Sequence, residues 1–285
     1  MAGLRRRLMA AVCAGLVAAG LASCTAHRSV QFDAGTTMQR LASAGKIRVG
    51  VKYDQPGLGF KNPATGKLEG FDIKIAEIIA AGLGLRPSQI VPVETVSQDR
   101  ERFLQTDRVD IVVASYSITT EHRRDVGQAG PYFITGQQLL VRAADTHRFN
   151  DPDRLTGARI CSATGSTSLA RAKRMYGPRM VEYPTYTECV RQLLRKSVDV
   201  VTTDGAVLLG YHNQQPDKLV VVGRPFSEER YGIGYRKGDR AFCQFLTDTL
   251  NHALANGDWE RAFKDTLGKA KAAIPAKPVT DPCQD

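Results

Sequence analysis

The chain has 285 residues, a formal net charge of +10, and a composition that is 42% hydrophobic and 24% charged. These values are typical of an ordinary globular protein that is long enough to form two lobes. The positive excess favours acidic small molecules or anionic surfaces as partners. The basic residues are scattered, without a clustered stripe and interleaved aromatic residues, so we expect no nucleic-acid binding.

The first 23 residues have the features of a secretory signal. Arg5-Arg6-Arg7 precede an apolar run from Leu8 to Leu21, and this run is too short for the roughly 20 residues of a membrane span. Leu21-Ala22-Ser23-Cys24 resembles a bacterial lipobox, in which the cysteine is acylated and becomes the new N-terminus. We therefore expect residues 1–23 to be a lipoprotein signal peptide and Cys24 to carry the lipid, palmitate included. Plain secretion and a signal anchor are the alternatives.

The mature protein would start at Cys24 and be anchored on the extracytoplasmic face of the cell membrane. Residues 24–45 are polar and weakly patterned, which predicts a tether that holds the folded part away from the membrane. Because the signal contains three arginines and no acidic residue, the mature chain keeps a net charge of +7.

Strands and helices alternate along the rest of the chain. Strands are predicted at residues 46–51, 90–93, 109–114, 138–141, 159–161, 180–183, 198–202, 219–222 and 231–235. Helices are predicted from a cap at Asp72 to Gly82 or Gly84, through Phe103, and at residues 168–176, 188–195, 206–213 and 239–256. This order indicates an α/β protein with mainly parallel sheets, in which ligands bind beyond the carboxyl ends of strands. The loops after Val51, Ala114, Cys161 and Thr203 are therefore the places to look for a site.

The cysteines agree with export. Four remain when Cys13 leaves with the signal and Cys24 carries lipid: Cys161, Cys189, Cys243 and Cys283. An even number in an oxidising compartment suggests two disulfides, with three pairings possible. We favour Cys161–Cys189 and Cys243–Cys283, which join neighbours in sequence, and four free thiols are the alternative. No pair has the spacing of a zinc site, so we expect no metal and no cofactor.

Several short blocks occur in a fixed order between Lys46 and Gly268. They are Gly50-Val51-Lys52-Tyr53-Asp54-Gln55-Pro56-Gly57, Leu68-Glu69-Gly70-Phe71-Asp72-Ile73, Arg108-Val109-Asp110-Ile111, Ser117-Ile118-Thr119, Gly130-Pro131-Tyr132-Phe133, Gly165-Ser166-Thr167-Ser168, Val198-Asp199-Val200-Val201-Thr202-Thr203-Asp204 and Tyr231-Gly232-Ile233-Gly234. In this order they resemble the family 3 solute-binding proteins of bacterial ABC importers for polar amino acids. The resemblance covers nearly the whole mature chain.

The resemblance implies a two-lobe, type II periplasmic-binding-protein-like fold whose two hinge strands close the lobes on a ligand. Lobe 1 would comprise residues 46–140 and 228–270, and lobe 2 residues 141–227. The hinge crossings are expected near residues 138–141 and 225–231. Residues 271–285 would form an irregular C-terminal tail.

The same resemblance implies a binding protein rather than an enzyme. A monomer would capture a polar or acidic amino acid and deliver it to an ABC permease and ATPase complex. Tyr53-Asp54-Gln55-Pro56-Gly57 resembles the glutamate-type subgroup, so glutamate is the first choice, followed by aspartate, glutamine and asparagine. Two alternatives are a binding protein that signals to a membrane kinase and a dehydratase-like enzyme, for which Asp54, Glu121 and His122 are the available acid–base groups.

Residues of lobe 2 are expected to hold the backbone groups of the amino acid. Asp204 stands where the family places the acceptor for the α-ammonium, and capping of the following helix is the alternative. Ser166 and Thr167 lie in a turn before a helix, whose free amides would receive the α-carboxylate.

Residues of lobe 1 are expected to complete the site. Ser115 and Ser117 occupy the family loop whose hydroxyls and amides contact the carboxylate, and Tyr116 or Phe60 would either cover the ligand or belong to the core. Arg100 resembles the arginine that glutamate-type members direct at the side-chain carboxylate, which suits the paired hydrogen bonds of a guanidinium. A solvated surface arginine is the other interpretation.

One position departs from the family pattern. The family has an arginine three residues after the threonine of Ser-Ile-Thr, where it binds the α-carboxylate, but this chain has His122 there and Arg123 one place later. A histidine with its ordinary pKa of about 6.5 is only partly charged at neutral pH. Either Arg123 takes over the role, or the carboxylate is held differently.

Overall fold

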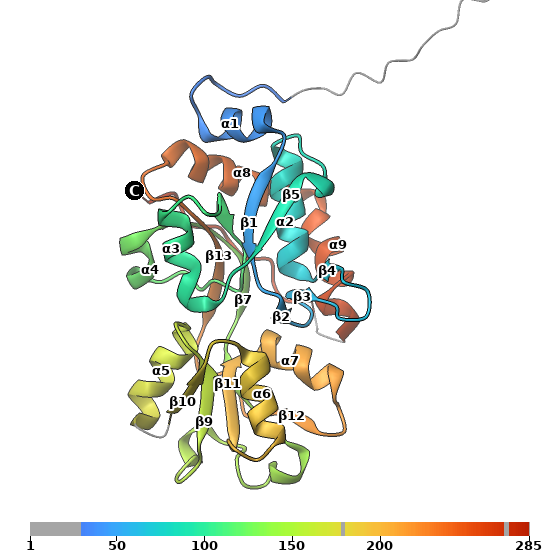
Figure 1. The fold of residues 1–285 in the computed structure, drawn as a ribbon, viewed down its shortest axis with the longest axis vertical. Helices are drawn as coiled ribbons and strands as arrows, with labels where there is room; N and C mark the ends of the chain where they lie inside the picture. The colour runs from blue at the N-terminus through green and yellow to red at the C-terminus, as the bar shows by residue number, and fades with distance from the viewer. Residues whose placement is uncertain (1–29, 178–179, 271–273, 285) are drawn as a thin grey trace, which may run out of the picture.

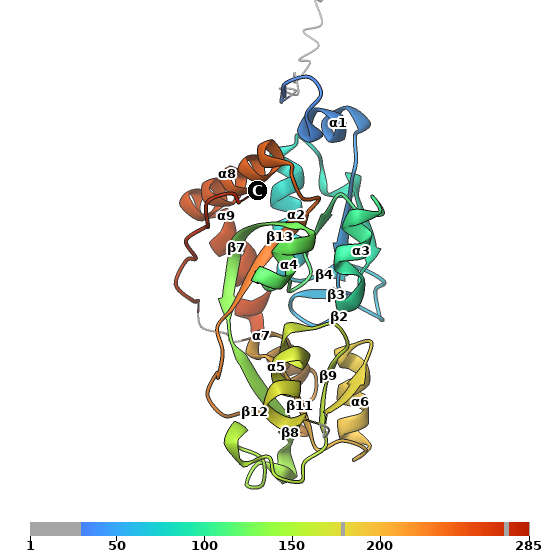
Figure 2. The same ribbon diagram turned by 90° about the vertical axis from the view of Figure 1, so that its left-hand side faces the viewer.

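The computed structural model describes residues 30–177, 180–270 and 274–284. Figures 1 and 2 show two α/β lobes arranged end to end along the long axis, joined by two extended segments that pass between their sheets. The predicted signal peptide and Cys24 lie outside the described residues. No helix in the described ranges is both long enough and apolar enough to cross a bilayer.

Lobe 1 contains a five-stranded sheet in the order β5-β1-β6-β13-β7. Its strands are β1 (Ile47–Val51), β5 (Ile90–Glu94), β6 (Ile111–Val112), β7 (Gly127–Thr135) and β13 (Glu229–Tyr235). β1 pairs in parallel with β5 and β6, whereas β13 runs antiparallel to β6 and β7. The return of the chain through β13 thus completes the lobe that the N-terminal half begins.

Helices and a small sheet surround this lobe. The helices are α1 (Thr37–Ala44), α2 (Phe71–Gly82), α3 (Arg100–Gln105), α4 (Thr120–Asp125), α8 (Arg240–Asn256) and α9 (Asp258–Lys264). The small sheet contains β2 (Asp54–Gln55), β3 (Gly59–Lys61) and β4 (Leu68–Glu69). Phe71, Ile75 and Ile79 are fully buried at four-residue spacing on α2, so this face of the helix packs on the core.

Lobe 2 has a second five-stranded sheet in the order β10-β9-β11-β8-β12. Its strands are β8 (Gln137–Arg142), β9 (Ile160–Ala163), β10 (Met180–Tyr183), β11 (Val200–Asp204) and β12 (Leu219–Val222), and its helices are α5 (Thr167–Tyr176), α6 (Tyr186–Leu194) and α7 (Gly205–Gln214). β9, β10 and β11 are parallel, which places the turns before α5 and α7 at the same edge of the sheet. This edge faces lobe 1 (Figure 1).

The two connections between the lobes touch each other. The amide of Phe226 donates to the carbonyl of Gln137, with a donor–acceptor distance of 3.0 Å. At Gly136, between β7 and β8, a Cβ would collide with the carbonyl oxygen of Ser227, so a glycine is required for the close approach. The expected crossing at residues 138–141 was wrong, because residues 137–142 already pair with β11 and β12 in the sheet of lobe 2.

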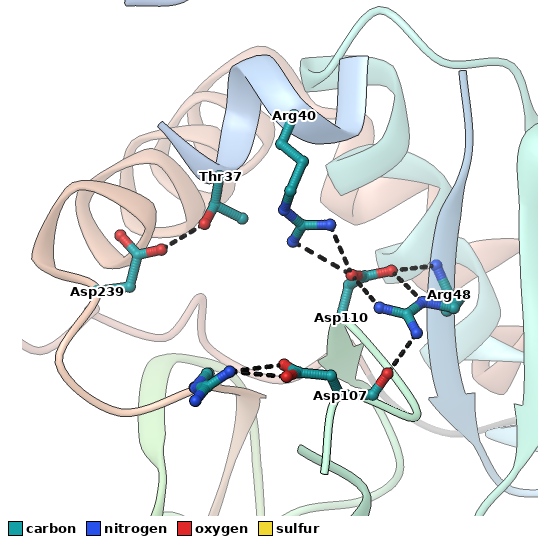
Figure 3. Close-up of polar contacts among 7 residues, drawn as sticks. Thr37, Arg40, Arg48, Asp107, Asp110 and Asp239 are labelled. Carbon is teal, nitrogen blue, oxygen red and sulfur yellow. Dashed lines mark hydrogen bonds and ion pairs between the residues drawn. The ribbon is translucent and has the colours of Figure 1, made fainter. Parts of the chain in front are cut away.

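The expected tether at residues 24–45 is contradicted at residues 37–44, which form α1, packed against lobe 1 (Figure 3). Residues 24–29 lie outside the described residues. The hydroxyl of Thr36 caps its N-terminus, and Leu41 is buried. Thr37 donates to Asp239 at the start of α8, and Arg40 forms an ion pair with Asp110. The weak sequence pattern concealed this helix, because one buried leucine and long-range polar contacts hold it in place.

Asp72 does not have the expected capping role. It is the second residue of α2, and the N-terminal cap is Gly70. Its buried carboxylate instead accepts from the amide of Ser115 and the hydroxyl of Tyr132, at 2.8 Å each. The carboxylate therefore fixes the loop after β6 instead of the end of its own helix.

The structure forms both expected disulfides, Cys161–Cys189 and Cys243–Cys283. The first joins β9 to α6 within lobe 2. The second attaches the C-terminal tail to α8, and the described tail residues contain no helix or strand, as expected.

Candidate functional site

Most of the candidate side chains meet where the two lobes face each other. We call this set the interlobe cluster: Arg100, Ser115, Tyr116, Ser117, His122 and Tyr231 from lobe 1, and Ser166, Thr167, Ser168 and Asp204 from lobe 2. Three hydrogen bonds cross directly between the lobes within it. They join Tyr231 to Asp204, Thr167 to Ser117, and Arg100 to the carbonyl of Gly165, at 2.6, 3.4 and 3.3 Å.

Asp204 ends β11 and is buried, with 4% of its surface exposed. Its side chain makes no capping hydrogen bond to α7, which excludes the alternative role. Its carboxylate accepts from the hydroxyls of Tyr231 (2.6 Å) and Ser168 (3.2 Å). Burial, together with the nearby charge of Glu229, raises the pKa of Asp204 to about 7. A buried carboxylate bonded only to hydroxyls is a suitable acceptor for a cation.

The N-terminus of α5 lies beside Asp204. The hydroxyl of Ser166 caps the helix by accepting from the amide of Leu169 at 3.0 Å. The amides of Thr167 and Ser168 have no hydrogen-bond partner among the described residues. Two free amides at the positive end of a ten-residue helix favour the binding of an anionic oxygen.

Arg100 begins α3 and is only 2% exposed, so the alternative of a solvated surface arginine is wrong. Its guanidinium lies over the ring of Tyr116, 4.2 Å from the centroid. Its nitrogens donate to the carbonyls of Ser97, Ala114, Ser115 and Gly165 at 3.0–3.5 Å. These carbonyls and the ring fix the cation at the boundary between the lobes.

The two serines of the loop after β6 differ in what they leave available. The amide of Ser115 is bonded to Asp72, and its hydroxyl donates to Gln55 at 2.8 Å. The hydroxyl of Ser117 instead accepts from Thr167 across the lobe boundary. Of the two, Ser117 is therefore the better placed to contact a bound molecule.

The two aromatic candidates have different environments. Tyr116 is completely buried among the residues of a small core cluster, and its hydroxyl donates to Glu101. It therefore supports Arg100 and belongs to the core, which was one of the two interpretations. Phe60, on β3, is half-buried, so it does not belong to the core.

His122 and Arg123 point to different parts of lobe 1. Nδ1 of His122 lies 2.9 Å from the carbonyl of Ser117, and Nε2 lies 3.5 Å from Glu101. Burial and the charge of Arg100 lower the pKa of His122, which favours a neutral ring. Arg123 forms an ion pair with Asp281 of the tail, at 2.9 Å. The hypothesis that Arg123 takes the role of the missing arginine is therefore contradicted in this arrangement.

Sequence reasoning missed three residues of this region. Tyr231, fully buried on β13, bonds Asp204. Lys52 is 4% exposed at the end of β1, and its ammonium donates to the hydroxyl of Ser97 at 2.9 Å. Gln55 is fully buried, and its Nε2 has no partner among the described residues. Lys52 and Gln55 stand in a block of the family resemblance, but neither had been assigned a role.

A second contact between the lobes lies beside the cluster. The carboxylate of Asp54, on β2 of lobe 1, accepts from the amide of Tyr186 (3.0 Å) and from that of Thr187 (3.4 Å), at the N-terminus of α6. The carbonyl of Asp54 accepts from the hydroxyl of Tyr211 on α7. One residue of lobe 1 thus bridges two helices of lobe 2.

Another group of charged residues surrounds a hollow of about 560 Å³ between α1, α8 and β6 (Figure 3). Five of its seven charges are paired with each other: Arg40 and Arg48 with Asp110, and Arg236 with Asp107. The other two also have partners, because Lys237 donates to the carbonyl of Arg124 and Asp239 caps α8. We therefore do not regard it as the functional site. The described residues also contain no group of three or more potential metal ligands.

Residues 47–269 match the model of the bacterial extracellular solute-binding proteins, family 3. The chain belongs to this family. This solute-binding protein is 33% identical to the glutamate-binding protein GluB of Corynebacterium efficiens, over 94% of this chain and 95% of that protein. It is 35% identical to a glutamine-binding protein of Geobacillus stearothermophilus, over 78% of this chain and 85% of that protein.

The solved structures agree with this assignment. An ancestral arginine-binding protein bound to arginine superposes with a TM-score of 0.73 at 30% identity, covering 78% of this chain and 98% of that one. An ancestral amino acid-binding protein described as a precursor of cyclohexadienyl dehydratase has a TM-score of 0.74 at 25% identity. The expected two-lobe fold of the solute-binding protein is confirmed.

Proposed function

We propose that this protein is the extracytoplasmic binding component of an ABC importer and that it captures a polar or acidic amino acid between its lobes. Glutamate is the first choice, and aspartate, glutamine and asparagine follow. The observation that carries the proposal is the placement of Asp204 beside the N-terminus of α5. Its buried carboxylate makes no capping hydrogen bond to α7, and the first amides of α5 have no partner in the part of the chain that the structure describes. The carboxylate of Asp204 would bind an ammonium group, and the amides of α5 would bind a carboxylate. These are the two charged groups of every free amino acid.

The relatives support the same ligand class, because they include a glutamate-binding and a glutamine-binding protein. A permease and ATPase complex would receive the amino acid from the closed form. We further propose that Cys24 carries a lipid that anchors the monomer to the membrane, and that the protein has no catalytic activity. The dehydratase-like alternative can be tested by incubating the protein with amino acids and keto acids. An enzyme would alter these compounds, whereas a binding protein would leave them unchanged.

The proposed function is tested by calorimetric titration of the purified mature protein with glutamate, aspartate, glutamine and asparagine. We expect saturable 1:1 binding of at least one of them, tightest for glutamate. The matched control is the D-enantiomer of each amino acid, whose side chain points in a different direction when its ammonium and carboxylate occupy the same positions. No heat and no thermal shift with any of the four would reject the proposal.

A further inference from the structure

The C-terminal tail is attached to one helix of lobe 1 at two points. The disulfide Cys243–Cys283 joins it covalently to α8. The hydroxyl of Thr280 donates to the side-chain oxygen of Asn251, on the same helix, at 2.9 Å. Asp281 lies between these two attachments, so its position against the lobe is fixed.

Asp281 contacts three separate elements of lobe 1. Its amide donates to the carbonyl of Gly130 on β7 at 2.6 Å. Its carboxylate accepts from both terminal nitrogens of Arg230 on β13, at 2.6 and 3.3 Å, and from Arg123 on α4 at 2.9 Å. A paired contact between a guanidinium and a carboxylate fixes orientation as well as distance. Burial opposes ionisation, but the hydrogen bonds from Arg230 and Arg123 outweigh it and lower the pKa of Asp281, so the carboxylate is charged at neutral pH.

The two strands that Asp281 contacts are those that continue into lobe 2. β7 leads directly to β8, and the second connection between the lobes ends where β13 begins. The pairing of the two strands is irregular beside the tail, where Gly130-Pro131-Tyr132 of β7 stand opposite Gly232 alone. An irregularity of this kind changes the direction of the side chains next to it. Tyr231 adjoins it, and its hydroxyl reaches Asp204 of lobe 2.

A short segment of lobe 1, residues 116–118, lies between β13 and α4, and we call it the Ser117 segment. On the side of β13, the amide of Ile118 donates to the carbonyl of Arg230 at 2.7 Å. On the side of α4, Nδ1 of His122 lies 2.9 Å from the carbonyl of Ser117. The Ser117 segment is therefore held by the two elements whose arginines bind the tail.

We propose that Asp281 is a positioning residue for amino-acid binding: by fixing β13 and α4, it holds the Ser117 segment where Ser117 meets lobe 2. This inference rests on the proposed function. The hydroxyl of Ser117 accepts from Thr167 across the lobe boundary at 3.4 Å. Because this distance is near the upper limit of a hydrogen bond, a small displacement of the Ser117 segment would break the contact. Asp281 thus acts on the site from the tail, through Arg230 and Arg123, without touching the ligand.

The inference is tested with Asp281→Ala, which removes the contacts with both arginines and leaves the disulfide in place. Calorimetry uses whichever of the four amino acids above the wild type binds most tightly. We expect the affinity to fall by about 3- to 30-fold, as for residues that act on a site through a packed network. Asp281→Glu keeps the carboxylate, and its affinity should lie within about threefold of the wild type. The matched control is Thr280→Val, which removes a contact of the tail with α8 and should leave the affinity unchanged.

A second variant keeps the test decisive if Asp281→Ala does not fold. Arg230→Met breaks the same contact from the side of β13 and leaves the attachments of the tail to α8 in place. We expect it to weaken binding by about 3- to 30-fold as well. The double variant should bind less than about twofold more weakly than Asp281→Ala, because both changes remove one interaction. Thermal unfolding of each ligand-free variant measures stability separately.

The outcomes separate the two proposals. If the wild type binds none of the four amino acids, the proposed function fails. If it binds one of them, the inference fails and the proposed function stands when Asp281→Ala or Arg230→Met binds as tightly as the wild type or more tightly. A loss of affinity in Thr280→Val equal to that in Asp281→Ala would also overturn the inference. So would additive losses in the double variant, or no recovery in Asp281→Glu.

Discussion

Asp204 combines three properties at the scale of a single residue: burial, hydrogen bonds from two hydroxyls, and a side chain that makes no capping hydrogen bond to α7. We expect Asp204→Asn to weaken amino-acid binding at least about 30-fold, because loss of one member of a buried charge pair costs about 2–5 kcal/mol. The ligand-free variant should unfold at the same or a higher temperature, since a buried negative charge is removed. Calorimetry and thermal unfolding measure both effects.

Asp199 provides the control for this variant. It precedes the same strand, but its carboxylate forms an ion pair with Arg159, which is half exposed. Asp199→Asn should therefore leave the affinity unchanged. Undiminished binding by Asp204→Asn would contradict the role of Asp204.

The pH dependence of stability follows from the raised pKa of Asp204, about 7 against an ordinary 3.8. Between these values the folded protein binds this proton more tightly than the unfolded chain, so the contribution of Asp204 to stability falls as the pH rises from about 4 to about 7. The raised pKa of Asp72 also makes stability fall as the pH rises, up to about pH 6. The lowered pKa of Lys52 has the opposite effect, because it makes stability rise with pH above about pH 7.

Urea unfolding of the ligand-free protein at pH 4.5, 6 and 7.5 tests this expectation. Because Asp72 is present in both proteins, the difference between wild type and Asp204→Asn isolates Asp204. As the pH rises, we expect the free energy of unfolding of Asp204→Asn to increase relative to that of the wild type, by at most about 1.4 kcal/mol per pH unit. A difference that does not vary with pH would show that Asp204 titrates normally.

At the scale of elements, Asp54 acts as an anion at the N-terminus of α6 from the opposite lobe. Charge at such a terminus contributes about 0.3–2 kcal/mol. We therefore expect Asp54→Asn to weaken ligand binding by up to about 30-fold, mainly through faster release from a less stable closed form. Stopped-flow measurement of ligand dissociation tests this.

The control for Asp54→Asn is Asp99→Asn, which removes a carboxylate bonded to Arg102 within lobe 1. It should leave the dissociation rate unchanged. If Asp54→Asn dissociates at the wild-type rate, the contact with α6 does not hold the lobes together.

The elements that the sequence predicted well are those with a clear hydrophobic pattern. The apolar runs of β1, β11 and β12 lie within a few residues of their predicted limits. β7 was missed, because Gly127, Gln128, Gly130 and Pro131 do not have the composition of a strand. Its pairing with β13, nearly one hundred residues later, supplies what the local sequence lacks.

At the scale of the whole molecule, the site depends on contacts that join lobes far apart in sequence. Asp204 and the α5 turn were recognised because each follows a predicted strand. The contact of Tyr231 with Asp204 was not predicted, because a tyrosine within a strand is common and only the packing of the two lobes brings its hydroxyl to Asp204. The ion pair of Arg123 with Asp281 depends on the path of the tail, which no local pattern predicts.

The central claim is that the two lobes close around an amino acid whose ammonium binds Asp204. A crystal structure of the protein grown with glutamate tests it most directly. We predict the ammonium nitrogen within hydrogen-bonding distance of Asp204, the α-carboxylate at the amides of Thr167 and Ser168, and the second carboxylate at Arg100. A ligand bound elsewhere, or a closed form in which Asp204 contacts no ligand atom, would contradict the account.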